Sequence, residues 1–150
     1  MHRLLISLAI SLLAVEVAAA SVETELTSVV QQWADGFNKA NAELIAASCA
    51  DEASVVDDFP LHEWKGARAC TRWFTDFQAF ATRVNIADAV ITVGEPGHVD
   101  ITGNVAYVVA PMELAYRSKG KPASLDGIVP IILRNGAAGW RITSVTWADV

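Results

Sequence analysis

The stretch that decides the fold is residues 49–74, CADEASVVDDFPLHEWKGARACTRWF. A short apolar run in it ends in two adjacent acids, of which the first is Asp57. A histidine, a tryptophan and a Lys-Gly step follow, and a cysteine lies near each end. We interpret this segment as one wall of a pocket, with Asp57 as its main polar group and a Cys49–Cys70 disulfide behind it.

The first half of the chain has the periodicity of helices interrupted once by a strand. Apolar side chains recur at three- and four-residue steps over residues 22–37, which predicts a helix with one apolar stripe. Asn-containing residues 38–41 break it, and a second, shorter helix follows. A β-branched run predicts a strand over 53–57, a proline and a glycine predict a loop over 59–66, and a broad apolar stripe predicts a third helix over 67–84.

The second half of the chain has no helical period. We expect a strand over 90–101 that is bent at its Gly-Glu-Pro-Gly step, because proline cannot donate to a ladder. Further strands are expected over 105–117, 121–134 and 140–149. Helices that precede four antiparallel strands predict an α+β fold, with three N-terminal helices packed on one face of a curled antiparallel sheet.

The N-terminus has the pattern of an export signal. Residues 1–20 begin with a basic pair, continue with a nearly uninterrupted apolar run over 4–15, and end in small residues before Ser21. A retained membrane anchor is the alternative, but the run is shorter than the ~20 residues of a membrane span and Glu16 interrupts it. We therefore predict a signal peptide over 1–20, a mature domain over 21–150, and a periplasmic or secreted protein.

Composition excludes several classes of partner. The 150 residues suit one domain, and the net charge of −6 argues against nucleic acid and against an anionic membrane surface. After signal cleavage only His62 and His98 remain, and neither belongs to a cluster with metal-ligand spacing. We expect no metal, no cofactor, no nucleic acid and no membrane partner.

The two cysteines favour a disulfide, because an exported protein folds in an oxidising compartment. Such a bridge would close a loop of about 20 residues and add roughly 3 kcal/mol to the free energy of unfolding. Two buried thiols that never meet are the alternative.

A resemblance extends this interpretation. The order of elements, together with CADEASVVDDF, EWKGARACTRWF and the closing GWRITSVTW, resembles the nuclear transport factor 2-like superfamily, with the SnoaL-like and ketosteroid-isomerase-like branches closest. It covers residues 21–150 and implies a cone of curved sheet, closed by three helices, with an apolar pocket inside. The superfamily hosts isomerases, dehydratases, cyclases, epoxide hydrolases and non-catalytic binders, so the fold does not settle function.

The resemblance also implies roles for single residues. Asp57 falls at the position of the isomerase general base, Phe59 at that of the aromatic beside it, and Trp33 at that of the oxyanion tyrosine. The second oxyanion donor aligns near Val129 or Pro130, whose side chains cannot donate. One lost donor typically costs about 10²–10³ in rate, so steroid isomerisation is not expected.

Other candidates complete the predicted site. His62 is a candidate acid–base partner of Asp57, and Trp64 a lid, core or ligand-contacting aromatic. Met112 and Tyr116 share one strand face that the resemblance places in the cavity, and Trp147 joins it from the last strand. Each of these side chains has an ordinary alternative as a core or surface residue.

Adjacent side chains on a strand point to opposite faces, so we expect only one of the two acids to face the cavity. The resemblance implies that Asp57 points inward, where an apolar wall would raise its pKa, and that Asp58 points outward. Asp126 is left open, because a one-residue bulge would reverse its direction. His98 is expected at the surface.

Two functions follow from these expectations. The first is an exported protein that binds a small, mostly apolar molecule, as a lyase, isomerase or hydrolase with Asp57 as general base. The second is a non-catalytic domain that only binds a ligand or dimerises through the outer face of its sheet. A homodimer is an expectation from the resemblance.

Overall fold

The computed structural model describes the backbone of residues 4–150 and the side chains from residue 18 onward. Over this part of the chain the helices are α1 (Leu4–Asn38), α2 (Ala42–Ser48) and α3 (Ala69–Arg83). The strands are β1 (Cys49–Val56), β2 (Glu63–Ala67), β3 (Ile86–Val93), β4 (His98–Thr102), β5 (Val105–Ser118), β6 (Lys121–Gly136), β7 (Gly139–Thr146) and β8 (Ala148–Asp149).

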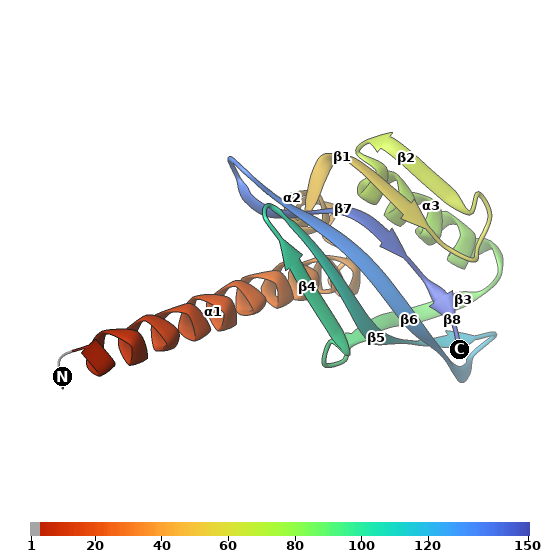
Figure 1. Cartoon of the computed structure of the whole chain (residues 1–150). Coiled ribbons are helices and arrows are strands. Elements are labelled where there is room, and N and C mark those ends of the chain that lie inside the picture. Colours follow the sequence, from red (N-terminus) through yellow and green to blue (C-terminus); the bar gives the residue numbers. More distant parts are fainter. Residues whose placement is uncertain (1–3) are drawn as a thin grey trace.

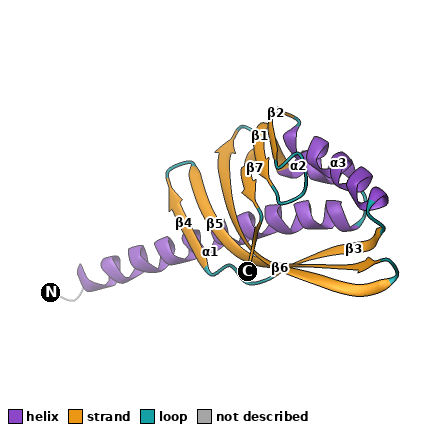
Figure 2. Ribbon diagram, turned by 90° about the vertical axis from the view of Figure 1, so that its right-hand side faces the viewer, coloured by secondary structure: helices purple, strands orange, loops and turns teal. Residues whose placement is uncertain are grey.

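The strands form one curled sheet in the order β2-β1-β7-β6-β5-β3, with β4 on β5 and β8 on β6. Figure 1 shows α3 beside β1 and β2, and Figure 2 shows α1 running along the sheet. The predicted α+β cone is confirmed. One pairing differs from the expectation of an antiparallel sheet: β1 and β7 are parallel. These two strands are adjacent in the sheet although α3 and five strands, β2 to β6, separate them in the chain.

The longest hairpin, β5–β6, supplies the floor of the cone. Ser118 pairs with Lys121, so the loop consists of Lys119 and Gly120, both with positive φ (50° and 81°). Two-residue loops of this kind match the right-handed twist of the strands they join. Alternate side chains of β5, from Ala106 to Met112, are buried on the concave side.

Two strand assignments depart from the sequence prediction. The predicted loop over 59–66 contains most of β2, because Trp64 is buried and its backbone pairs with Val55 of β1. The predicted strand over 90–101 is two strands, β3 and β4, that both pair with β5. The backbone N–H of Gly94 donates to the carbonyl of Pro111 at 2.8 Å, which anchors the bend between them.

Helix termini are tied to the sheet by asparagine side chains. At the end of α1, the amide of Asn38 donates to the carbonyl of Ile91 (2.8 Å) and accepts from its N–H (2.7 Å), which fixes α1 against β3. Asn41 caps α2 by accepting from the N–H groups of Glu43 and Leu44. The break between α1 and α2 therefore has a defined geometry.

The predicted signal peptide falls at the start of α1. Residues 1–3 lie outside the described part of the chain, and residues 4–20 continue the helix that carries core residues such as Leu26 and Trp33 further on. In the span 4–150, no helix combines the length and the apolarity required to cross a membrane.

The predicted disulfide is present. The Sγ atoms of Cys49 and Cys70 are 2.08 Å apart, and the bond joins the start of β1 to the first turn of α3. Both cysteines are buried. The bridge fixes the N-terminal end of α3 beside the strand that ends at Asp57.

A first prediction concerns this bridge. The double variant Cys49→Ala/Cys70→Ala should lower the free energy of unfolding by about 3 kcal/mol, because the closed loop restricts the unfolded chain. Urea denaturation of both proteins measures the difference. A thiol count on denatured, unreduced wild-type protein is the control, and two titratable thiols would contradict the bridge.

The C-terminal segment packs against a glycine of β6. A Cβ atom built on Gly127 would lie 2.6 Å from Cε2 of Trp147, closer than real Cβ contacts. The Trp147 backbone N–H donates to the carbonyl of Val56 (3.0 Å), and β8 pairs with β6. The hydrogen bond to Val56 before Trp147 and the pairing of β8 after it therefore hold the Trp147 ring over β6.

A second prediction follows from this contact. Gly127→Ala should displace the Trp147 ring and lower the free energy of unfolding by about 1–3 kcal/mol, the usual effect of overpacking. The matched control is Gly97→Ala, because a Cβ at Gly97 would meet nothing within 4 Å. Equal stability of the two variants in urea denaturation would show that Trp147 does not pack as described.

Candidate functional site

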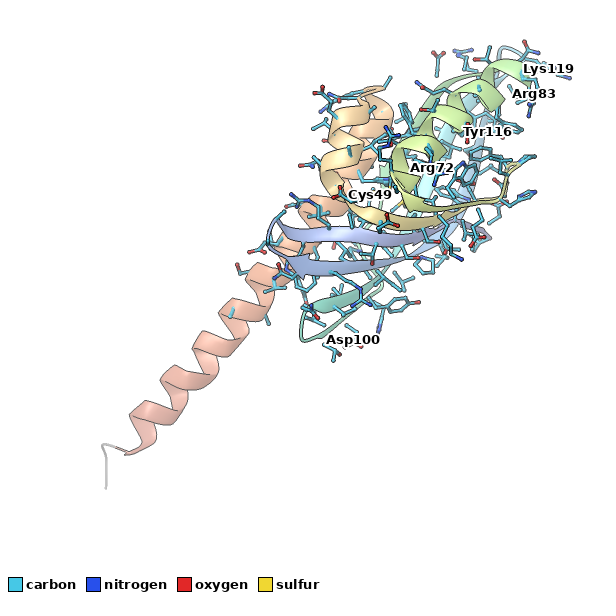
Figure 3. The ribbon with its side chains drawn as sticks, turned by 90° about the horizontal axis from the view of Figure 1, so that it is seen from above. Cys49, Arg72, Arg83, Asp100, Tyr116 and Lys119 are labelled. Atoms are coloured by element: carbon cyan, nitrogen blue, oxygen red, sulfur yellow. A yellow bond between two sulfur atoms is a disulfide. The ribbon has the colours of Figure 1, made fainter. Side chains whose placement is uncertain are left out.

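A cavity of about 250 Å³ lies between the end of α1, helix α3, strands β3, β5 and β6, and the C-terminal segment. Its lining is mostly aromatic and aliphatic, with two carboxyl groups, and consists of Phe37, Asp57, Asp58, Phe59, Pro60, Trp73, Phe77, Phe80, Ile86, Ile91, Leu114, Tyr116, Leu125 and Trp147. Figure 3, seen from above, shows Tyr116 between α3 and the strands. An enclosed apolar cavity with few polar groups is the usual form of a small-molecule site.

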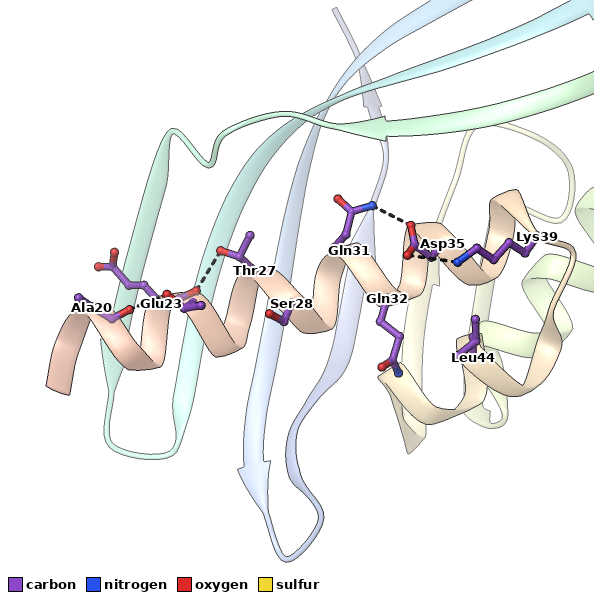
Figure 4. A pocket seen from close by; sticks show the side chains of 10 residues that line it. Ala20, Glu23, Thr27, Ser28, Gln31, Gln32, Asp35, Lys39 and Leu44 are labelled. Atoms are coloured by element: carbon purple, nitrogen blue, oxygen red, sulfur yellow. Dashed lines mark hydrogen bonds and ion pairs between the residues drawn. The ribbon is translucent and has the colours of Figure 1, made fainter. Parts of the chain in front are cut away.

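A wider depression of about 850 Å³ lies along the polar face of α1 (Figure 4). Its side chains bond mostly to neighbours on the same helix: Gln31 donates to Asp35 (2.9 Å), and Lys39 lies 3.6 Å from the same carboxylate. Gln32 donates instead to the hydroxyl of Ser48 on α2 (3.0 Å). The lining is the solvated side of a helix. We therefore place the candidate site in the smaller apolar cavity.

Asp57 is the first residue after β1, and its carboxyl group accepts two hydrogen bonds. The indole N–H of Trp73 donates to Oδ2 at 2.7 Å, and the backbone N–H of Asp58 donates to Oδ1 at 2.8 Å. Burial raises the pKa of Asp57 to about 7, assisted by the neighbouring Asp58 carboxyl and opposed by the two N–H donors. The group therefore exchanges its proton near neutral pH.

Trp73, on α3, is the site residue that sequence reasoning missed. Its place in the apolar stripe of the third helix indicated a core residue, and its ring does stack on Trp33 with a centroid distance of 5.2 Å. The chemistry of tryptophan could have indicated this role. A buried indole N–H usually has a hydrogen-bond acceptor, and Asp57, an acid that follows a buried strand, is a candidate acceptor. Sequence spacing alone could not bring residues 57 and 73 together.

The two acids differ from the expected arrangement. Asp57 points into the cavity, as predicted, but the exposed Asp58 also lines it, where an outward side chain was expected. β1 ends at Val56, so both acids lie in the loop beyond the strand. Strand alternation therefore does not separate their side chains.

His62 does not reach the carboxyl group of Asp57. It is exposed, in a turn with a φ of 67°, and its Nδ1 lies 3.3 Å from the backbone carbonyl oxygen of Asp57. The backbone N–H of Asp57 donates to the carbonyl of His62 at 3.0 Å. In this arrangement His62 shapes the loop and is not among the residues that line the cavity.

The predicted ligand-contacting residues divide into two groups. Phe59 and Tyr116 line the cavity together with Trp147. Trp33 and Trp64 are 1% and 2% exposed and, like Met112, lie in the core outside the lining. The side chains of Trp33, Trp64 and Met112 are packed among other core residues and do not reach the cavity.

The indole groups of the buried tryptophans have different partners. The Trp64 N–H donates to Oδ2 of Asp76 at 2.7 Å. The Trp33 N–H has no hydrogen-bond partner among the described residues. Because Trp33 does not line the cavity, its indole is not placed as the oxyanion donor that the resemblance implied.

The register of the sheet also shows to which face the side chains of β6 point. Leu125 pairs with Leu114, and both line the cavity, so the exposed Asp126 lies on the outer face. Val129 is fully buried on the inner side, and Pro130 points the other way. The register shift of β6 lies between Ile132 and Leu133, beyond these residues, and does not reverse them.

Among the described residues, no three His, Cys, Asp or Glu side chains converge on a point where a metal ion would fit. The polar groups of the lining are the two carboxyls, the Tyr116 hydroxyl and the indole N–H groups of Trp73 and Trp147. The two indoles already donate, Trp73 to Asp57 and Trp147 to Asp149, which leaves the carboxyls and the hydroxyl for a ligand.

Solved structures with this architecture come from several bacteria. An NTF2-like protein with a cystatin-like fold from Novosphingobium aromaticivorans has a TM-score of 0.74 at 15% identity, over 92% of this chain and 88% of that one. A nuclear transport factor 2-like superfamily protein from Salmonella enterica has a TM-score of 0.72 at 15% identity, over 87% and 92%. A ketosteroid isomerase-like protein from Erwinia carotovora has a TM-score of 0.63 at 15% identity, over 83% and 93%.

At 15% identity these structures establish the fold of the chain, and its activity has to be argued from the residues of the site. No curated protein sequence matches the chain. The model of the SnoaL-like domain family matches residues 26–146, which include every residue of the cavity lining except Trp147. The chain belongs to the SnoaL-like domain family.

Proposed function

We propose that this domain binds a small, mostly apolar molecule in its cavity and that Asp57 transfers a proton to or from it. The observation that carries this proposal is a half-buried carboxyl that lines an aromatic cavity, with a pKa raised to about 7. A general base is most effective when its pKa is near the working pH. Reactions of this kind include those of lyases, isomerases and hydrolases.

The geometry of the carboxyl group supports this role. Trp73 and the Asp58 backbone each donate one hydrogen bond, to different oxygens of Asp57. Each carboxylate oxygen has two lone-pair directions, so both oxygens retain one for a substrate proton. Tyr116, from the opposite wall, is the hydroxyl-bearing residue of the lining and a candidate donor to a substrate oxygen.

A non-catalytic binder is the second candidate, and the absence of certain donors favours it. Trp33 lies outside the lining, and the side chains of Val129 and Pro130 cannot donate. An enolate formed in the cavity would lack these two donors. The apolar residues exposed on the outer sheet face, among them Tyr107 and Ile128, would in this case also support the expected homodimer.

Export of the protein is part of the same proposal. We infer that residues 1–20 act as a signal peptide and are removed before Ser21, which gives the mature domain 21–150. The disulfide between Cys49 and Cys70 supports an oxidising compartment, periplasmic or extracellular.

A third prediction tests the ionisation of Asp57. Its pKa is about 7 in the folded protein, against 3.8 for an unperturbed aspartate, so the folded state retains a proton that the unfolded chain releases between these values. Stability from this group is present below about pH 4 and is lost as the pH rises to about 7. Relative to wild type, Asp57→Asn should gain at most about 4 kcal/mol across that window.

Urea denaturation at a series of pH values measures this difference. The matched control is Asp100→Asn, on the exposed strand β4, whose difference from wild type should not follow the same curve. The Trp73 indole N–H resonance, identified by its loss in Trp73→Phe, should titrate with a midpoint of about 7. A pH-independent resonance over pH 5–9 would contradict the raised pKa.

A fourth prediction tests catalysis. The ligand that co-purifies with the protein is identified by mass spectrometry, and its turnover is compared between wild type and Asp57→Asn. Loss of a general base should lower kcat by about 10²–10⁴. Unchanged turnover would retire Asp57 as the base, and tight binding without any turnover by the wild type would favour the non-catalytic binder.

A further inference from the structure

The charged groups of the cavity lining have one sign. Asp57 and Asp58 are the ionisable acids of the lining, and no lysine, arginine or histidine belongs to it. Neither acid takes part in an ion pair in the part of the chain that the structure describes. A half-buried carboxylate without a counter-charge, such as Asp57, is costly, and a ligand that supplies a positive charge would compensate it.

Aromatic side chains supply much of the cavity lining, and several of their rings pack against one another. Phe59 lies 5.3 Å from Phe80 and 5.7 Å from Phe77, and Phe37 lies 5.7 Å from Trp73, measured between ring centroids. The faces of such rings carry a negative potential, and a cation within about 6 Å of a ring centre is stabilised. The guanidinium of Arg83, which is not part of the lining, lies 5.5 Å from the Phe80 centroid, so the rings left for a ligand cation are those of the lining other than Phe80.

We propose that the cavity selects a small organic cation, an ammonium group on an apolar body, which lies between the carboxyl groups of Asp57 and Asp58 and the aromatic rings. This rests on the proposed function, because it names the chemical class of the molecule that the cavity binds. The apolar body contacts the aliphatic wall formed by Ile91, Leu114 and Leu125.

Cation binding and proton release at Asp57 are then linked. Asp57 is close to half protonated at neutral pH, and a bound cation favours the carboxylate and expels the proton. Among the groups that face Asp57, Trp73 donates from α3 and does not titrate, while Asp58 and His62 belong to the loop after β1. Tyr116 faces the cavity from β5.

The test uses three probes of similar size and the purified wild-type protein. Benzyltrimethylammonium is a permanent cation, neopentylbenzene is its neutral isostere, and 3-phenylpropionate is an anion. At pH 8 the cation should bind at least tenfold more tightly than the neutral isostere, and the anion most weakly. Binding is measured by calorimetry and by the shift of the Trp73 indole resonance.

The pH dependence gives a second readout. Because benzyltrimethylammonium does not titrate, a change in its affinity with pH belongs to the protein. With an Asp57 pKa of about 7, its affinity should rise about thirty-fold from pH 5.5 to pH 8, while that of the neutral isostere stays constant. Asp57→Asn should remove this rise, whereas Asp100→Asn, which removes the same charge far from the cavity (Figure 3), should retain it.

The outcomes separate this inference from the proposed function. A neutral isostere that binds as tightly as the cation, or an anion that binds best through Arg83, would overturn the cation preference and leave small-molecule binding intact. If none of the probes binds or shifts the Trp73 resonance, both proposals fail. Should Asp57→Asn not fold, the comparison of the three probes on wild-type protein still decides.

Discussion

The hydrogen bond between the Trp73 indole N–H and Oδ2 of Asp57 is the interaction on which the site depends. It joins the second turn of α3 to the residue directly after β1, and the Cys49–Cys70 bridge ties the first turn of α3 to the start of β1. Together they fix one wall of the cone and direct a carboxyl group inward. Charge-assisted bonds of this kind are stronger than neutral ones, so the arrangement holds an ionisable group where burial disfavours its charge.

The site therefore combines two opposing influences on one group. Burial and the Asp58 carboxyl favour the protonated form of Asp57, whereas the two N–H donors favour the carboxylate, and burial prevails. A group balanced in this way responds to what enters the cavity. A proton acceptor, a neutral hydrogen-bonding ligand and a counter-charge for a cation are three uses of the same carboxyl, and the aromatic lining excludes the water that would weaken each of them.

Much of this could be predicted from sequence, for reasons particular to each element. The periodicity of residues 22–37 predicted the C-terminal half of α1, and the lack of a helical period in the second half of the chain predicted the strands β5 and β6. Strand β2 was missed, because Trp64 is buried by tertiary packing that a loop-like Pro and Gly pattern conceals. Trp33, Trp64 and Met112 were expected in the cavity, but the packing of the elements, which periodicity does not encode, buries them in the core outside the lining.

The sequence by itself determined the fold class and the disulfide partners, and it singled out Asp57 as a candidate site residue, because these follow from local periodicity and from residue chemistry. Tertiary structure alone decided that Trp73 is the partner of Asp57 and that His62 is not, since this depends on how α3 lies across the sheet. It also decided that Asp58 shares the cavity, because β1 ends one residue before the acids. Contacts between distant segments are set by packing, and spacing along the chain does not specify them.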